Sequence, residues 1–426
     1  MKAGRATLTP ASPGPSPMKA LLADRRFVRW LTSEVVNTLG TGISTVVLPI
    51  LIYRRTGSPA QTGIVSGLRV VPYLVFGLIA GPIADRFDRK RLLVFGLIGE
   101  GVAMATIPIA DIVGQVSVAQ IYIVTLLAAV CFVFADAAAF GALPSITGPE
   151  LLPTANGLLL ALTSSALVAG PAVGALLTTW IGAAPAIWFD AASFLLAALV
   201  LAGIGGSFRA AGTQHSKTIR AQSREGISFI WHERVILTLV LVGFLNSLAF
   251  GAVIGQLVVY GDKVLRIHEG GIRVGILYTA GAVGTLIAGL LFARIYTTPR
   301  VRVITPTALA AGSLITLGVA ATSTFLVAVG LYVLLSLAIQ LVFSAGITYR
   351  QLASPAHLVS SVNVVGRMVA WGGQPFGALL GGVTTEVFGI RWMGVLAAAV
   401  FAVASLAAFI GLRRTIPARA SIVASA

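Results

Sequence analysis

Residues 325–347 read FLVAVGLYVLLSLAIQLVFSAGI and contain no charged side chain. A helix needs about 20 apolar residues to cross the hydrocarbon core of a bilayer, so this run predicts a membrane-spanning helix. Further runs of the same kind predict spanning helices at 30–53, 62–84, 92–110, 118–141, 157–182, 184–206, 235–260, 274–294, 303–321, 364–388 and 391–412. We therefore predict an all-α integral membrane protein with twelve transmembrane helices.

The composition excludes a soluble enzyme. Hydrophobic residues make up 57% and charged residues 10% of the chain, whereas soluble domains carry about 25% charged residues. The mean hydropathy is +0.94. No HExxH or GxSxG motif occurs, and none of the five lysines follows a glycine, so the chain has no Walker phosphate loop. We expect neither enzymatic activity nor a catalytic residue, and ATP is not an on-chain energy source.

Metal and disulfide chemistry are also not expected. The single Cys131 cannot form an internal disulfide. The four histidines are not spaced like metal ligands: His215, His232, His268 and His357. We therefore predict no metal site and no cofactor.

The basic residues are distributed unevenly between the two sides of the membrane. With the amino terminus inside, 23 Lys and Arg residues fall in cytoplasmic segments and 6 in outer loops. Basic residues concentrate on the cytoplasmic side of membrane proteins, so we expect both termini in the cytoplasm. The net charge of +16 then reflects topology, and we expect no nucleic-acid partner.

The longest polar gap, 207–234, divides the chain into two halves of six helices. We predict a disordered tail (1–24), a six-helix bundle (25–206), a linker with an amphipathic helix at 219–231 (207–234), a second six-helix bundle (235–412) and a second tail (413–426). Both tails and the linker are expected to be cytoplasmic.

Glycines recur at the same place in each half. Gly170 and Gly174 in the fifth predicted helix correspond to Gly377 and Gly381 in the eleventh, at an offset of 207 positions. Six helices return the chain to the same side of the membrane, so this offset predicts two parallel repeats with a pathway at their interface.

Residues 81–93, GPIADRFDRKRLL, resemble the loop 2–3 signature of the major facilitator superfamily. Asp88 stands where the superfamily prefers Gly. Further segments resemble a bacterial branch of macrolide, siderophore and multidrug exporters: 68–81, 151–158, 170–177, 188–194 and 224–231. The resemblance implies the major facilitator fold and transport by alternating access. That branch often has Gly-Asp in helix one where this chain has Gly40-Thr41. In this chain the role of that Asp is therefore either not filled or filled by a residue at another position.

The signature implies a cytoplasmic gate formed by Gly81, Asp85, Arg86, Arg89, Arg91 and Asp136. We expect Gly77 and Gly81 to let helix two approach a neighbour closely. Asp85 is expected to accept hydrogen bonds from the amino terminus of helix eleven, and Asp136 to pair with Arg89. The alternative is that the basic cluster only fixes topology.

Residues 170–174, GPAVG, resemble a proline-glycine motif of antiporter branches. Gly170 and Gly174 give helix five a thin face, and Pro171 removes a backbone donor. We expect this motif to make the helix pliable during exchange, with ordinary tight packing as the alternative.

Ionisable residues inside spans are costly in lipid and indicate function. They are Glu34, Arg69, Glu100, Asp136 and Asp190. Glu34 is the first choice for a proton-coupling group, because a carboxyl group in a partly dry cavity can load and release a proton near neutral pH. Glu100 is the second choice. We expect Arg69 and Asp190 to be structural.

The resemblance implies that helices one, four, seven and ten line a cavity. The cavity residues expected from these helices are Asn37, Thr41, Tyr122, Phe132, Asn246, Phe250, Tyr332, Ser336 and Gln340. Apolar and aromatic walls with a few polar groups and one carboxylate suit an amphipathic organic substrate.

These observations predict a secondary exporter of amphipathic small molecules of the drug, antibiotic or siderophore type, driven by proton antiport. The partners are a small-molecule substrate, protons and membrane lipid, and the protein is expected to be a monomer in the bacterial cytoplasmic membrane. The alternatives are a lipid or lysolipid flippase of the same fold and a membrane sensor that transports nothing.

Overall fold

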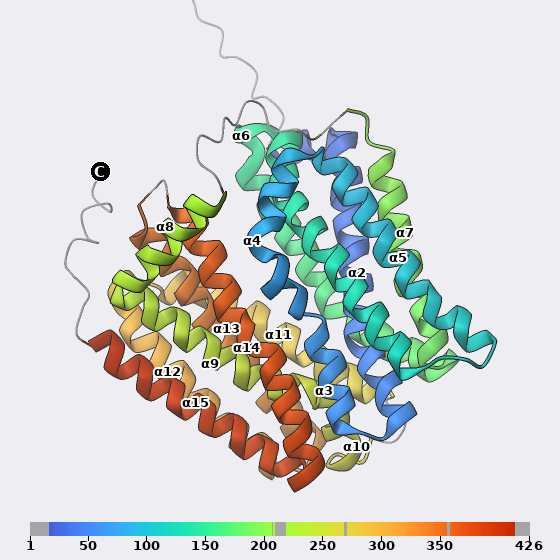
Figure 1. Cartoon of the computed structure of the whole chain (residues 1–426), viewed down its shortest axis with the longest axis vertical. Helices are drawn as coiled ribbons and strands as arrows, with labels where there is room; N and C mark the ends of the chain where they lie inside the picture. Colours follow the sequence, from blue (N-terminus) through green and yellow to red (C-terminus); the bar gives the residue numbers. More distant parts are fainter. Residues whose placement is uncertain (1–16, 207, 209–218, 268–270, 356–357, 414–426) are drawn as a thin grey trace, which may run out of the picture.

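The computed structural model describes residues 17–206, 208, 219–267, 271–355 and 358–413, and this part of the chain is helical throughout, with no strand (Figure 1). The helices are α1 (Pro17–Ala23), α2 (Arg25–Thr56), α3 (Pro59–Leu68), α4 (Val71–Arg86), α5 (Arg89–Ile112), α6 (Val118–Ile181), α7 (Ala183–Ala202), α8 (Ile219–His232), α9 (Arg234–Gly255), α10 (Leu257–Lys263), α11 (Ile272–Ile295), the 3-10 turn η2 (Thr298–Arg300), α12 (Val301–Ala321), α13 (Phe325–Ala353), α14 (Val359–Phe388) and α15 (Ile390–Arg413).

Eleven helical segments of the described residues are long and apolar enough to cross a membrane. The helix α14 is not among them, because Asn363, Arg367, Gln374 and Glu386 make it less apolar. It is nevertheless 30 residues long and packs along α9, as a twelfth spanning helix would. The predicted all-α membrane fold is confirmed.

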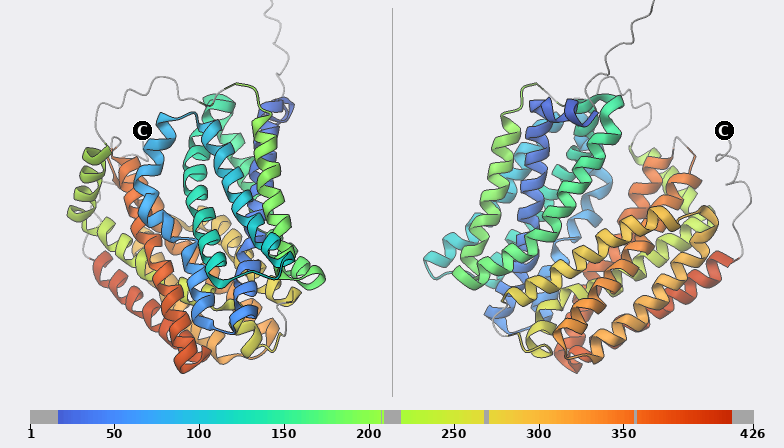
Figure 2. Two further views of the ribbon diagram at one scale, coloured as in Figure 1. Left: turned by 45° about the vertical axis from the view of Figure 1, so that its right-hand side comes forward. Right: turned by 180° about the vertical axis from the view of Figure 1, so that it is seen from behind.

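The long helices form two groups (Figure 2). Helices α2 to α7 lie on one side of the molecule and α9 to α15 on the other. The groups approach each other near α3 and α10, which we call the α3/α10 end, and separate toward the end that carries α1 and α8, the α1/α8 end (Figure 2). The contacts between the two groups at the α3/α10 end therefore close the molecule on that side.

Four predicted helices differ in their bounds from those observed. The second span breaks at Arg69 and Val70, just before Pro72, which has no backbone donor to continue the first segment. The fourth and fifth predicted helices are both observed, as Val118–Gly148 and Glu150–Ile181. They are longer than predicted and share the label α6, because the backbone between them leaves the helical conformation only at Gly148, whose φ of 73° favours glycine. The seventh span ends at Gly255 and a short helix, α10, follows.

The amino-terminal tail is shorter than predicted. Residues 17–23 form α1 instead of a disordered segment, and Leu21 is only 1% exposed within the hydrophobic core. The predicted amphipathic linker helix is observed as α8, which packs against the start of α14 at Gly226. Residues 1–16, 209–218 and 414–426 lie outside the described part of the chain.

The recurrent glycines make the same packing contact in both groups. A Cβ added to Gly170 of α6 would lie 2.8 Å from the Cα of Gly42 in α2. A Cβ added to Gly377 of α14 would lie 1.8 Å from the carbonyl oxygen of Leu248 in α9. The fifth helix therefore packs on the first as the eleventh packs on the seventh, as expected of two parallel repeats.

The close approach expected at Gly77 is not observed. A Cβ added there would meet no atom within 4 Å, so this glycine is not a packing contact in this structure. Gly81 and the side chain of Asp85 lie outside the described part of the structure.

Candidate functional site

A cavity with two lobes lies between the helix groups. The lobes measure about 260 Å³ and about 320 Å³. They share the lining residues Thr45, Ile254, Tyr278, Trp371 and Gln374. Since Thr45 belongs to the first group and the other four to the second, both groups build the same site.

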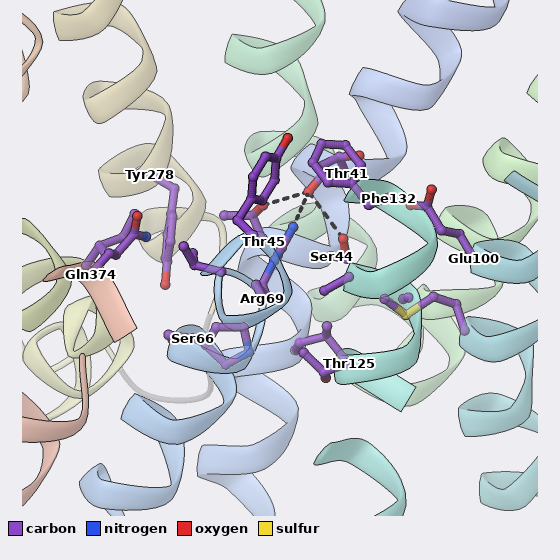
Figure 3. A pocket seen from close by; sticks show the side chains of 18 of the residues that line it. Thr41, Ser44, Thr45, Ser66, Arg69, Glu100, Thr125, Phe132, Tyr278 and Gln374 are labelled. Atoms are coloured by element: carbon purple, nitrogen blue, oxygen red, sulfur yellow. Dashed lines mark hydrogen bonds between the residues drawn. The ribbon is translucent and has the colours of Figure 1, made fainter. Parts of the chain in front are cut away.

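The first lobe holds most of the polar and charged groups (Figure 3). Its polar lining includes Thr41, Ser44, Thr45, Ser66, Arg69, Glu100 and Thr125. Arg69 donates to the carbonyl oxygen of Thr41 at 3.4 Å, and the hydroxyls of Ser44 and Thr45 donate to the same oxygen. Tyr278 and Gln374 of the second group face this cluster across the lobe (Figure 3). The charged side chain of Arg69 therefore forms part of the cavity wall.

The second lobe is mainly aromatic and apolar. Phe250, Tyr332 and Phe343 line it together with Ser336 and Gln340. The Ser336 hydroxyl is buried and has no hydrogen-bond partner in the described structure. A large apolar surface with one unsatisfied hydroxyl suits an amphipathic organic molecule.

The structure brings together part of the predicted cavity set. Thr41, Phe132, Phe250, Tyr332, Ser336 and Gln340 line the two lobes. Asn37, Tyr122 and Asn246 do not. Asn246 is fully buried and donates weakly to the Ile339 carbonyl oxygen at 3.4 Å, while Tyr122 contacts Gln61 at 3.5 Å.

The carboxylate that lines the cavity is Glu100 rather than Glu34. The Glu34 side chain lies outside both lobes, and its charge interacts with that of Asp136. Arg69 and Asp190, expected to be structural, lie near Glu100 instead, and the three charges interact. The two lobes are thus lined by one carboxylate, as predicted, but it is Glu100, and Arg69 lines the first lobe beside it.

Asp136 accepts a hydrogen bond from a residue that the sequence did not indicate. The Tyr73 hydroxyl donates to its carboxylate at 2.5 Å, and the predicted pair with Arg89 stays a prediction. The Tyr73 ring packs edge-on against Trp371 at 6.0 Å, and the guanidinium of Arg367 lies over both rings. Since Tyr73 belongs to α4 and the other two to α14, this cluster joins the two groups on the α1/α8 side of the cavity.

The basic loop of the signature is held by local contacts. Asp88 caps α5 by accepting from the backbone of Lys90 at 3.0 Å, which explains an Asp where the superfamily prefers Gly. The Lys90 ammonium donates to the Ile204 carbonyl oxygen at the end of α7. Arg86 and Arg91 are exposed. The described residues of this loop thus tie α5 to α7, and its role as a gate stays a prediction.

Glycines of the helix-five motif pack tightly on α2. Gly170 faces Gly42, and a Cβ at Gly174 would lie 2.9 Å from the carbonyl oxygen of Ile43. Pro171 lines the second lobe. These contacts support the packing role of the motif, whereas pliability during exchange stays a prediction.

Polar contacts close the cavity at the α3/α10 end. Glu386 of α14 accepts from the hydroxyl of Ser58 at 2.7 Å and from the backbone of Ala60 at 3.0 Å, at the start of α3. Tyr53 of α2 donates to Asp262 of α10 at 2.9 Å. These contacts join the two groups, so this end must separate for the cavity to open there.

We expect Glu386→Gln to weaken this closure, because the amide is a poorer acceptor than the carboxylate for donors at the start of a helix. In a Cys131→Ala background, an engineered cysteine at Thr45 reports access to both lobes. Labelling by a membrane-impermeant maleimide from the α3/α10 side should rise roughly twofold to fivefold, the range of an exposed charged contact. Unchanged labelling would show that Glu386 does not hold the closed state.

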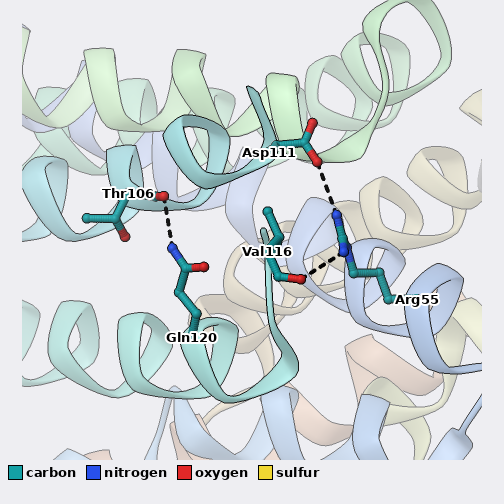
Figure 4. A network of polar contacts seen from close by, with 5 residues as sticks. All are labelled: Arg55, Thr106, Asp111, Val116 and Gln120. Carbon is teal, nitrogen blue, oxygen red and sulfur yellow. Dashed lines mark hydrogen bonds and ion pairs between the residues drawn. The ribbon is translucent and has the colours of Figure 1, made fainter. Parts of the chain in front are cut away.

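A second set of contacts at this end lies within one group (Figure 4). Arg55 forms an ion pair with Asp111 at 3.1 Å and donates to the Val116 carbonyl oxygen at 2.8 Å. Gln120 donates to the Thr106 carbonyl oxygen at 2.9 Å. The bonds of Arg55 connect α2 with the end of α5 and the turn that follows it, and the bond of Gln120 connects α6 with α5, so none of them joins the two groups.

Two groups of spanning helices around a shared, partly charged cavity define a membrane transporter. Residues 31–372 match the sequence profile of the Major Facilitator Superfamily. The chain belongs to this superfamily.

Curated relatives include efflux proteins. The multidrug efflux pump Tap of Mycobacterium tuberculosis is 28% identical over 382 residues, which are 85% of this chain and 87% of that protein. Macrolide efflux protein A of Streptococcus pyogenes is 25% identical over 152 residues, 36% of this chain and 38% of that protein.

Solved structures share the fold at low identity. The nucleoside transporter NupG aligns with a TM-score of 0.74 at 12% identity, covering 92% of this chain and 100% of that chain. A bacterial homolog of the human lysosomal transporter Spinster, in an inward-facing and occupied conformation, aligns with a TM-score of 0.75 at 15% identity, covering 95% of this chain and 100% of that chain.

Proposed function

We propose that the protein exports amphipathic small molecules across the bacterial cytoplasmic membrane by proton antiport. The observation that carries this proposal is the cavity between the two groups, whose aromatic lobe adjoins a lobe with Arg69 and Glu100. The names of the multidrug and macrolide efflux relatives support export of drug-like substrates.

We further propose that the α1/α8 end faces the cytoplasm, with both termini on that side. The excess of Lys and Arg in the segments at this end supports the orientation. The two six-helix groups then act as the moving units, and the contacts of Glu386 and Tyr53 close the outer side. In this arrangement substrate enters from the cytoplasm at the α1/α8 end, when the contact of Tyr73 with Trp371 and Arg367 opens.

Everted membrane vesicles test the proposal. With an imposed proton gradient and no ATP, we expect uptake of ethidium and erythromycin that a protonophore abolishes, because export from the cell becomes uptake into the vesicle. Vesicles from cells without the protein are the control. Movement of a fluorescent lysolipid without uptake of either drug would favour a flippase, and no movement of any probe would favour a sensor.

A further inference from the structure

Three ionisable side chains whose charges interact are buried inside the first group of helices. Glu100 of α5 and Asp190 of α7 are only 3% and 0% exposed. Arg69 stands at the break between α3 and α4 and lines the first lobe together with Glu100, and its charge interacts with both carboxylates. Among the described residues, no ion pair joins these three side chains, so their charges interact without direct contact.

Several polar atoms of this cluster are unsatisfied. Both carboxylate oxygens of Asp190, the Oε1 atom of Glu100 and the Nη1 atom of Arg69 are buried without a hydrogen-bond partner in the described structure. Unpaired buried charges cost several kcal/mol each. Two carboxylates and one guanidinium carry a net charge of −1, which a single bound proton removes.

We propose that Arg69, Glu100 and Asp190 together form the binding site of the transported proton. The inference rests on the proton-coupled export proposed above. Glu100 lines the cavity and exchanges the proton with water there, while Asp190 is fully buried and lines neither lobe. The positive charge of Arg69 compensates one of the two carboxylates, and the other carries an uncompensated negative charge until it binds the proton.

The cluster acts directly on α2. Arg69 donates to the Thr41 carbonyl oxygen at 3.4 Å. A Cβ added to Gly40 would lie 3.0 Å from the Oδ1 atom of Asp190, so this carboxylate lies against the α2 backbone. The nearby Ser44 hydroxyl donates to Thr41 and can turn toward Asp190. A change in the charge of the cluster therefore changes the contacts of the helix that carries Tyr53, one of the contacts closing the α3/α10 end.

Other titratable groups reach the cluster from the neighbouring helices. Their charges interact with Glu100 or Arg69, and they are Glu34 on α2, Tyr73 on α4, Cys131 and Asp136 on α6, and Tyr278 on α11. Glu34 is the competing candidate for the proton site, since Asp136, the other carboxylate near the cluster, already accepts a hydrogen bond from Tyr73.

Infrared difference spectra of the purified full-length protein report protonated carboxyl groups. The spectra are recorded above about pH 6, where exposed Asp and Glu are ionised. The wild type should then show a band of protonated carboxyl groups whose intensity changes with pH. We expect Asp190→Asn and Glu100→Gln each to abolish it, because Arg69 then balances the remaining carboxylate. Adding Arg69→Gln to Asp190→Asn leaves Glu100 uncompensated, so the band should return.

Return of the band in the double variant also shows that these substitutions leave the protein folded. The matched control is Asp111→Asn, which removes an exposed carboxylate paired with Arg55 and should leave the band unchanged. A band that survives in both single variants and disappears in Glu34→Gln would overturn the inference. So would a double variant without the band.

Vesicle transport decides the proposed function separately. A wild type that shows this titration but moves none of the probes would refute export and leave the proton site standing. A wild type that exports ethidium with a band unaffected by Asp190→Asn and Glu100→Gln would refute the site and leave export standing.

Discussion

Bridging a cysteine at Ser58 to a cysteine at Glu386 is expected to stop transport completely, and cleaving the bridge to restore it. The hydroxyl of Ser58 and the carboxylate of Glu386 lie 2.7 Å apart and belong to different helix groups. A short, reducible bifunctional thiol reagent can therefore join the two positions in a Cys131→Ala background. If the groups rock against each other, a covalent link at the α3/α10 end holds the cavity closed on that side.

A second cysteine pair separates this effect from mere modification of the surface. Arg55 and Asp111 are also partners at the α3/α10 end, but both belong to the first group, and each is about one-third exposed. Bridging cysteines at these positions should leave proton-driven ethidium uptake into everted vesicles near its unbridged level. Full transport by the bridged Ser58 and Glu386 pair would contradict alternating access through the α3/α10 end.

The sequence alone predicts the membrane fold because the bilayer leaves few choices. Backbone polar groups in lipid must be satisfied internally, so each long apolar run has to be a helix. The glycine offset could be recognised for a similar reason. Gly170 and Gly377 both lie where two helix backbones are in contact and leave no room for a side chain. Glu100 could be singled out as a candidate functional residue because a carboxylate inside a span is costly.

The arrangement within the site could not be predicted in the same way. Arg69, Glu100 and Asp190 stand on three different elements, and their proximity depends on how each helix is rotated about its axis. In the sequence, only Pro72 indicates the break at Arg69, and an argument from hydrophobic periodicity does not consider that proline. Tyr73 and Trp371 are ordinary apolar-span residues until α4 and α14 are placed side by side.

Substituting Gly377 by Leu is expected to prevent stable folding. A Cβ at this position would lie 1.8 Å from the Leu248 carbonyl oxygen, and backbone atoms cannot move aside as a flexible side chain can. Helices α9 and α14 would have to separate, with an overpacking cost of about 3 kcal/mol or more. We expect loss of the monodisperse peak in size-exclusion chromatography of the detergent-extracted protein, or a clearly lower melting temperature.

Gly289 provides the matched control for this effect. It also lies in a spanning helix, α11, but an added Cβ would meet no atom within 4 Å, and the residue is exposed on the surface of the bundle. Gly289→Leu should therefore keep the wild-type elution profile and melting temperature, because a leucine side chain there extends into lipid. If Gly377→Leu were equally well folded, α9 and α14 would not pack backbone to backbone, and the equivalent contact between Gly170 and Gly42 would lose its support as a repeated structural feature.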